Sequence, residues 1–158
     1  MKEAHVREAQ LKDAIELAPR LRKIDREEIK ACENISALEA LVKPFTYKNA
    51  KTYSVVENET DKVLGMFGSA PCADPEYGVA WLLSSEDLYK HTKEFVKQSP
   101  HWVNEMSKGY IYLYNFVDKR NWKSLKWLQY LGFEPKQELE TYGNSKQPFL
   151  LMIKEINN

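Results

Sequence analysis

The chain has 158 residues, in which 23 lysine and arginine side chains balance 23 aspartate and glutamate side chains. This length indicates one domain, 1–158, that can bury a sizeable core without disulfides or metals. A zero formal net charge disfavours nucleic acid as a partner, because a duplex-binding surface usually carries a basic surplus. A basic cluster at Lys119, Arg120, Lys123 and Lys126 could meet phosphate, but a solvated loop and helix start is the favoured interpretation.

The two cysteines, Cys32 and Cys72, form no CxxC pair and no cluster with histidine. We therefore predict no zinc or other metal site. Two reduced thiols are the favoured interpretation for a cytosolic chain, and a single disulfide between the two cysteines is the alternative. The N-terminus lacks the apolar core of a secretory signal, and no apolar run reaches the ~20 residues that span a bilayer. We expect a soluble chain in the cytoplasm of the cell that makes it.

The first part of the chain is predicted to be mainly helical after a short extended segment. A helix begins near Asp13 and keeps an apolar stripe at helical spacing. Pro19 lies inside that stripe and should kink the helix or split it in two. Ser36 and Glu39 form a capping-box pattern that opens a further helix, which Pro44 closes.

Three strands and a helix are expected next. Residues 52–57 and 63–69 form a predicted hairpin, and 78–83 form a third strand. A helix then starts at Glu86 or Asp87, with negative charge at its positive end. Pro100 is expected to restart this helix, because proline is well tolerated at the first helical position.

The stretch from Tyr110 to Pro135 predicts a strand, a loop, a helix and the start of another strand. Residues 110–116 are aromatic and apolar, which is typical of a strand buried on both faces. Asn121 can cap the helix, and Gly132 can end it in the left-handed conformation. A final hairpin is predicted at 139–142 and 149–156. This order of elements predicts an α/β fold in which helices cover both faces of a mixed sheet.

The order of elements and the residues after the 110–116 strand resemble the GNAT family of acetyl-CoA-dependent N-acetyltransferases. The family motif has Asn, a small residue at plus three, Tyr at plus seven and Gly-Phe at plus eleven and twelve. Asn121, Ser124, Gly132 and Phe133 fall on four of these positions. The resemblance implies a GNAT-like domain with a mostly antiparallel mixed sheet and a splayed strand pair. For an active protein it implies acetyl-CoA as cofactor, bound by Leu82, Leu83, Ser84, Asn121 and Ser124.

Two departures from the family pattern count against activity. The family has a glycine-rich loop that cradles pyrophosphate at a helix N-terminus, whereas the stretch 84–91 has no glycine and carries two carboxylates. Like charge should lower the affinity for diphosphate there. The plus-seven position is Leu128, so the tyrosine that commonly protonates the thiolate is missing. Tyr130 lies about 200° further round the helix and should point elsewhere.

These departures resemble a narrower group, the GNAT-like proteins of podovirus-type tailed phages, which include a small internal virion protein. The shared features are an aromatic strand that ends in paired serine or threonine, a following helix without glycine, and the Asn…Leu…Gly ending. The resemblance implies a protein partner in a virion or host. It places the chain in the host cytoplasm when made, with the virion as a further location.

No catalytic residue is assigned from the sequence, and Glu86 and Tyr130 are the two candidates. Glu57 and Glu76 are further candidate bases, although each is more often a solvated carboxylate. Three functions stay open. The first is a phage-type protein with a degenerate cofactor loop that acts through protein contacts. The second is an active acetyltransferase for a protein or small-molecule amine, and the third is a host-takeover module with no link to acyl transfer.

Overall fold

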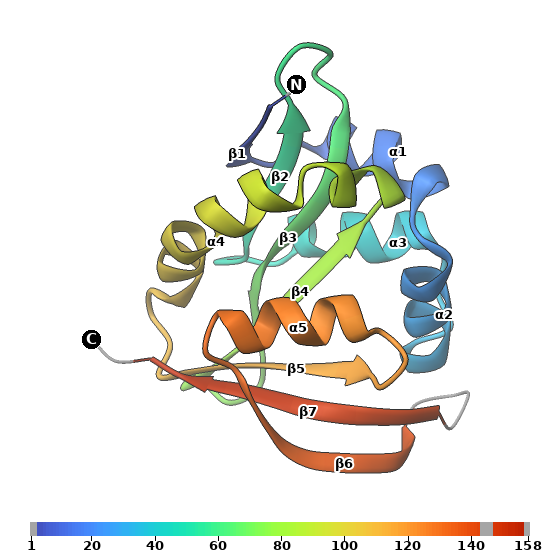
Figure 1. The fold of residues 1–158 in the computed structure, drawn as a ribbon. Coiled ribbons are helices and arrows are strands. Elements are labelled where there is room, and N and C mark those ends of the chain that lie inside the picture. The colour runs from blue at the N-terminus through green and yellow to red at the C-terminus, as the bar shows by residue number, and fades with distance from the viewer. Residues whose placement is uncertain (1–2, 143–146, 157–158) are drawn as a thin grey trace.

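The computed structural model describes residues 3–142 and 147–156 and shows a twisted sheet with helices on both faces (Figure 1). Seven described strands lie in the order β1-β2-β3-β4-β5-β7-β6. Their bounds are β1 Ala4–Glu8, β2 Lys51–Glu57, β3 Val63–Pro71, β4 Tyr77–Ser84, β5 Tyr112–Asp118, β6 Glu134–Tyr142 and β7 Gln147–Glu155. Only β4 and β5 pair in parallel; the other five neighbouring pairs are antiparallel. The predicted fold class is therefore confirmed.

The helices form two layers. They are α1 Leu11–Leu17, α2 Lys23–Cys32, α3 Ala37–Val42, α4 Thr92–Ser107 and α5 Trp122–Tyr130, with short 3-10 turns η1 Ala18–Arg20, η2 Lys43–Thr46 and η3 Glu86–Lys90. Helices α4 and α5 pack on one face of the sheet through Phe95, Val103 and Trp127. Helices α1 and α3 pack on the other face through Leu17 and Leu41. The layers bury β3 on both sides, and all its residues from 63 to 70 are buried.

Several local predictions are confirmed. Pro19 lies in η1, which separates α1 from α2, because proline in a helix interior removes a backbone donor. Ser36 and Glu39 form the predicted capping box of α3. Asn121 accepts a hydrogen bond from the Ser124 N–H and so caps α5. Gly132 ends that segment with φ +96°, where a side chain would be strained.

Other predictions were wrong in detail. Pro100 does not restart a helix, since α4 runs continuously through it. The segment from Glu86 to Lys90 is the separate 3-10 turn η3 rather than the start of α4. Strand β5 begins two residues later than predicted, and its half-buried Tyr112, Tyr114 and Phe116 show that it is not buried on both faces. The predicted final hairpin forms, but its turn at 143–146 lies outside the described residues.

Candidate functional site

Strands β4 and β5 separate after a short parallel contact. They pair only at Tyr77–Tyr112, Gly78–Leu113 and Val79–Tyr114, and Figure 1 shows them diverging beyond that point. The predicted splayed strand pair is therefore present. We call the space between the strands beyond this contact the wedge. A cavity lies on each face of the sheet beside the wedge, and Leu82 of β4 lines both.

The cavity under α4 and α5 is the larger one, about 500 Å³, and we call it the α4–α5 groove. Its lining is mainly aromatic and aliphatic: Leu82, Leu88, Tyr89, Thr92, Phe95, Val96, Trp122, Lys123, Lys126, Trp127 and Tyr130. Phe95 and Trp127 stack at 5.4 Å between ring centroids. The groove is thus an apolar channel whose only charged lining residues are two lysines.

The cavity on the other face is about 280 Å³ and we call it the Glu28 pocket. Glu28 and Cys32 of α2 face it together with Trp81 of β4 and Phe116 of β5. The pKa of the Glu28 carboxyl is raised to about 8, mainly by burial and also by the nearby carboxylates Asp25 and Asp118, while a hydrogen bond from Asn121 opposes the rise. Burial likewise raises the pKa of the Cys32 thiol to about 12. The pocket therefore offers a carboxyl that changes charge near neutral pH.

The end of β4 beside the wedge is closed by the chain itself. The Ser84 N–H donates to Asp25 Oδ2 at 3.0 Å, and the Ser84 carbonyl accepts from the Arg22 N–H at 2.9 Å. Leu21 also forms a β-bridge with Ser85. Both backbone groups of Ser84 that point away from β3 are consequently bonded. Since peptide groups alternate along a strand, the corresponding groups of Leu82 face the wedge, whereas those of Leu83 face β3.

A polar cluster, formed by the buried Arg22, Asp25 and Asn121 and the half-buried Glu28, holds this closure in place. Arg22 binds Asp25 through Nε at 3.0 Å and Nη2 at 2.8 Å, and both side chains are at most 3% exposed. Asn121 Nδ2 donates to Glu28 Oε2 at 3.0 Å, while its Oδ1 accepts from Arg22. Burial raises the pKa of the Asp25 carboxyl, and Arg22 offsets only part of that rise. The side chain of Asn121 is thus committed within the protein.

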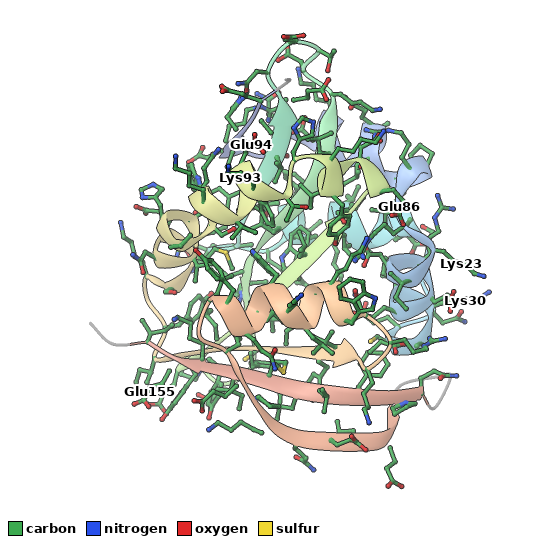
Figure 2. The ribbon with its side chains drawn as sticks, in the orientation of Figure 1. Lys23, Lys30, Glu86, Lys93, Glu94 and Glu155 are labelled. Atoms are coloured by element: carbon green, nitrogen blue, oxygen red, sulfur yellow. The ribbon has the colours of Figure 1, made fainter. Side chains whose placement is uncertain are left out.

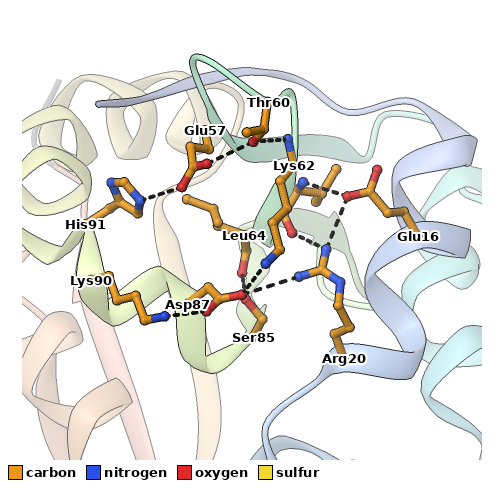
Figure 3. Close-up of polar contacts among 11 residues, drawn as sticks. Glu16, Arg20, Glu57, Thr60, Lys62, Leu64, Ser85, Asp87, Lys90 and His91 are labelled. Atoms are coloured by element: carbon orange, nitrogen blue, oxygen red, sulfur yellow. Dashed lines mark hydrogen bonds and ion pairs between the residues drawn. The ribbon is translucent and has the colours of Figure 1, made fainter. Parts of the chain in front are cut away.

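The turn η3 after β4 is fixed by an ionic network, drawn in Figure 3. Asp87 lies 2.7 Å from Lys62 Nζ, 3.2 Å from Lys90 Nζ and 3.9 Å from an Arg20 Nη atom. The hydrogen bonds from Lys62 and Lys90 lower the pKa of Asp87. At the far end of the turn, His91 Nε2 lies 3.0 Å from Glu57 Oε2. These contacts tie the glycine-free segment to the body of the protein.

Several solved structures of acetyltransferases share this architecture. Aminoglycoside 6'-acetyltransferase type Ii has a TM-score of 0.73 and 18% identity, with 98% of each chain covered. The ribosomal-protein-S5-alanine acetyltransferase from Vibrio fischeri has 0.69 and 19%, covering all of this chain and 96% of its own. A GNAT-family acetyltransferase from Streptococcus pneumoniae has 0.64 and 19%, covering 98% of this chain and all of its own. The chain has the GNAT acetyltransferase fold. No protein-family model matches it, and no curated protein sequence does.

Within the GNAT frame, the five predicted cofactor residues lie around the wedge. Leu82 faces the cavities, Leu83 lines the Glu28 pocket, and Ser84 is held by Asp25 and Arg22. Asn121 belongs to the polar cluster, and the buried Ser124 Oγ has no partner among the described residues. The structure therefore brings the five residues together. However, the outward-facing backbone groups of Ser84 and the side chain of Asn121 are already hydrogen-bonded within the protein.

The two catalytic candidates do not share a cavity. Glu86 is exposed at the start of η3, where Figure 2 shows it beside α2. Tyr130 is 58% exposed on the rim of the α4–α5 groove. Glu57 binds His91, and Glu76 is exposed before β4. Leu128 is 2% exposed and belongs to the core, so the GNAT tyrosine position is filled by an apolar packing residue.

Sequence reasoning missed the residues of α2 that meet the wedge. Asp25, Glu28 and Cys32 recur at spacings of three and four, which places them on one helical face. That pattern is visible in the sequence, but on its own it matches the polar face of any solvated helix. Its polar face becomes significant only when the sheet brings Ser84 and Asn121 beside it.

Other classes of site find no support among the described residues. No group of three or more metal-ligating side chains occurs in 3–142 and 147–156. Cys32 and Cys72 are both free thiols. None of the described helices is long and apolar enough to cross a membrane.

Proposed function

We propose that this GNAT-fold chain acts through protein contacts, as a component of a phage particle or on a host factor, rather than through efficient acetyl transfer. The observation that supports this is the closure of β4 at Ser84. Its N–H and carbonyl, which on the GNAT model would be available to the cofactor, bond to Asp25 and Arg22. Freeing the Ser84 N–H for a ligand would move the Asp25 carboxylate away from Arg22, and breaking such a buried ion pair costs several kcal/mol.

The η3 segment supports the same proposal. A pyrophosphate cradle needs small residues and free backbone N–H groups. Here Leu88 is 1% exposed in the core and Tyr89 lines the groove, so bulky side chains occupy the segment. Two carboxylates, Glu86 and Asp87, stand in its first turn. Asp87 is paired with Lys62 and Lys90, so the repulsion of a diphosphate would come from the exposed carboxylate of Glu86.

Calorimetry with acetyl-CoA tests the proposal. We expect no saturable heat when the purified chain is titrated with acetyl-CoA to millimolar concentration. Micromolar binding that free CoA competes away would overturn it. The particle role has a separate test, since the chain should then occur at a fixed copy number in purified particles of the phage that encodes it. Its absence from such particles would contradict that role.

A second candidate function is acetyl transfer to an amine, and the Glu28 pocket favours it. An acetyl transfer needs a base to take the proton of the attacking ammonium. The Glu28 carboxyl, with its pKa raised to about 8, lies on the opposite side of the wedge from the α4–α5 groove. Acetyl-CoA would supply the acetyl group as a thioester, and Glu28 would take the proton that the attacking amine loses. The same titration with acetyl-CoA decides between the two candidates.

A further inference from the structure

The α4–α5 groove has the shape of a binding site for an apolar side chain. Its floor is formed by Leu82 and Leu88, which are 9% and 1% exposed. Its rim carries Trp122 and Tyr130, which are 61% and 58% exposed. The groove volume of about 500 Å³ lies within the range of ligand pockets. Exposed large aromatics beside an apolar cavity are typical of interaction sites.

The charge on the groove has one sign. Lys123 and Lys126 are its only charged lining residues, and no described carboxylate lies within ion-pair distance of either ammonium. Their neighbours Lys119 and Arg120 are paired with Glu138 and with Asp118 and Glu27, respectively. The two groove lysines contact rings instead, with Lys123 Nζ 4.1 Å from the Tyr89 ring centroid and Lys126 Nζ 5.9 Å from that of Trp122.

These two features select the chemistry of an occupant. The apolar floor favours an aromatic or leucine side chain, because such a side chain gains about 25 cal/mol for each Å² removed from water. The two ammonium groups favour carboxylates on either side of that anchor. A phosphate-rich ligand is disfavoured, because η3 offers no glycine-lined cradle and carries the exposed carboxylate of Glu86.

We infer that the α4–α5 groove binds a short acidic segment of a partner protein, with an aromatic or leucine anchor seated over Leu82 and Leu88. This inference rests on the proposed function and specifies the partner's chemistry. The anchor fills the channel between α4 and α5. The flanking carboxylates of the segment pair with Lys123 and Lys126, which then exchange ring contacts for ion pairs.

Selection from a random 12-residue peptide display library on the immobilised full-length chain tests the inference. We expect enriched peptides to carry Phe, Trp or Leu flanked by Asp or Glu. A synthetic copy of an enriched peptide should bind the double variant Lys123→Glu/Lys126→Glu at least tenfold more weakly. Trp122→Ala should weaken binding as well. Lys12→Glu, which reverses an exposed charge on α1 outside the groove, is the matched control and should bind like the wild type.

The outcomes separate this inference from the proposed function. Peptides without carboxylates, binding that the double variant leaves unchanged, or no enrichment at all would each overturn the inference. A peptide that binds as expected while acetyl-CoA gives no heat supports both. Displacement of a bound peptide by micromolar acetyl-CoA would overturn the proposed function, because the cofactor would then occupy the groove. Failure of the selection with no acetyl-CoA heat overturns only the peptide inference.

Discussion

Individual side chains decide whether the wedge is open. The Asp25 carboxylate accepts from the Ser84 N–H, and the Arg22 backbone N–H donates to the Ser84 carbonyl. The side chains of Asp25 and Arg22 are nearly completely buried and pair with each other. Paired buried charges add little net stability, but an unpaired one is costly. The cluster is therefore sensitive to the loss of any one member. The closed end of β4 depends on it.

Asp25→Asn should destabilise the protein by about 3 kcal/mol, because it leaves the Arg22 guanidinium buried without a counter-charge. The free energy of unfolding from urea titration measures this. Glu27→Gln, which removes the partly exposed pair of Glu27 with Arg120, is the control and should cost less than ~1 kcal/mol. Equal effects of the two substitutions would contradict the role of the buried pair.

Glu28 should make stability depend on pH. Its pKa is about 8 in the folded protein and near the ordinary glutamate value in the unfolded chain, so the folded state binds more protons between those values. Stability is therefore lost as the pH rises through that window. Relative to Glu28→Gln, the wild type should lose on the order of 3 kcal/mol between about pH 5 and pH 8.

Urea titrations at several pH values measure this difference. Glu33→Gln is the matched control, because it removes an exposed carboxylate that lines the same pocket as Glu28. It should follow the wild-type pH profile. Parallel profiles for Glu28→Gln and the wild type would show that the Glu28 carboxyl is not buried as the structure has it.

At the level of elements, η3 stands where the GNAT pattern has its glycine-rich loop. Its 3-10 hydrogen bonds, which include those from the Leu88 N–H to Ser85 and from the His91 N–H to Leu88 at its two ends, have poorer geometry than those of an α-helix and give it little stability of its own. The contacts of Asp87 with three cations and of His91 with Glu57 hold it in place. Tertiary contacts therefore define this turn.

Asp87→Asn should loosen η3 without unfolding the protein. We expect the amides of residues 86–91 to exchange several-fold faster with solvent, because local opening no longer breaks three ion pairs. The amides of α5 should be unaffected. Glu59→Gln, a neutralised exposed carboxylate in the neighbouring β2–β3 turn, is the control. Unchanged exchange in 86–91 would show that the packing of Leu88 alone holds the turn.

At the scale of the whole molecule, the sheet separates two cavities that meet at Leu82. The GNAT fold creates both, because β4 and β5 pair at only three positions before they diverge. The fold alone does not imply transfer, since function depends on the groups within the wedge. In this chain one cavity is aromatic and basic and the other contains a buried carboxyl. The Asp25–Arg22 pair lies beside both.

The sequence predicted much of the fold because its signals are local. The capping box at Ser36, the helix end at Gly132 and the split at Pro19 each follow from backbone constraints on a few neighbouring residues. The prediction of a helix start at Pro100 was wrong because it, too, relied on a local signal. Its proline signal is local, whereas packing of Phe95 and Val103 into the core keeps α4 continuous across it.

The candidate site could be predicted only in part. Asn121 and the lack of glycine in 84–91 can be read from the chain, and they indicated a GNAT-like frame with an altered loop. The hydrogen bond from the Ser84 N–H to Asp25 could not be predicted from the sequence. The two residues are 59 positions apart and meet only when α2 lies against the end of β4. Patterns over neighbouring residues determined the elements, whereas burial and charge pairing between distant segments decided what the wedge can bind.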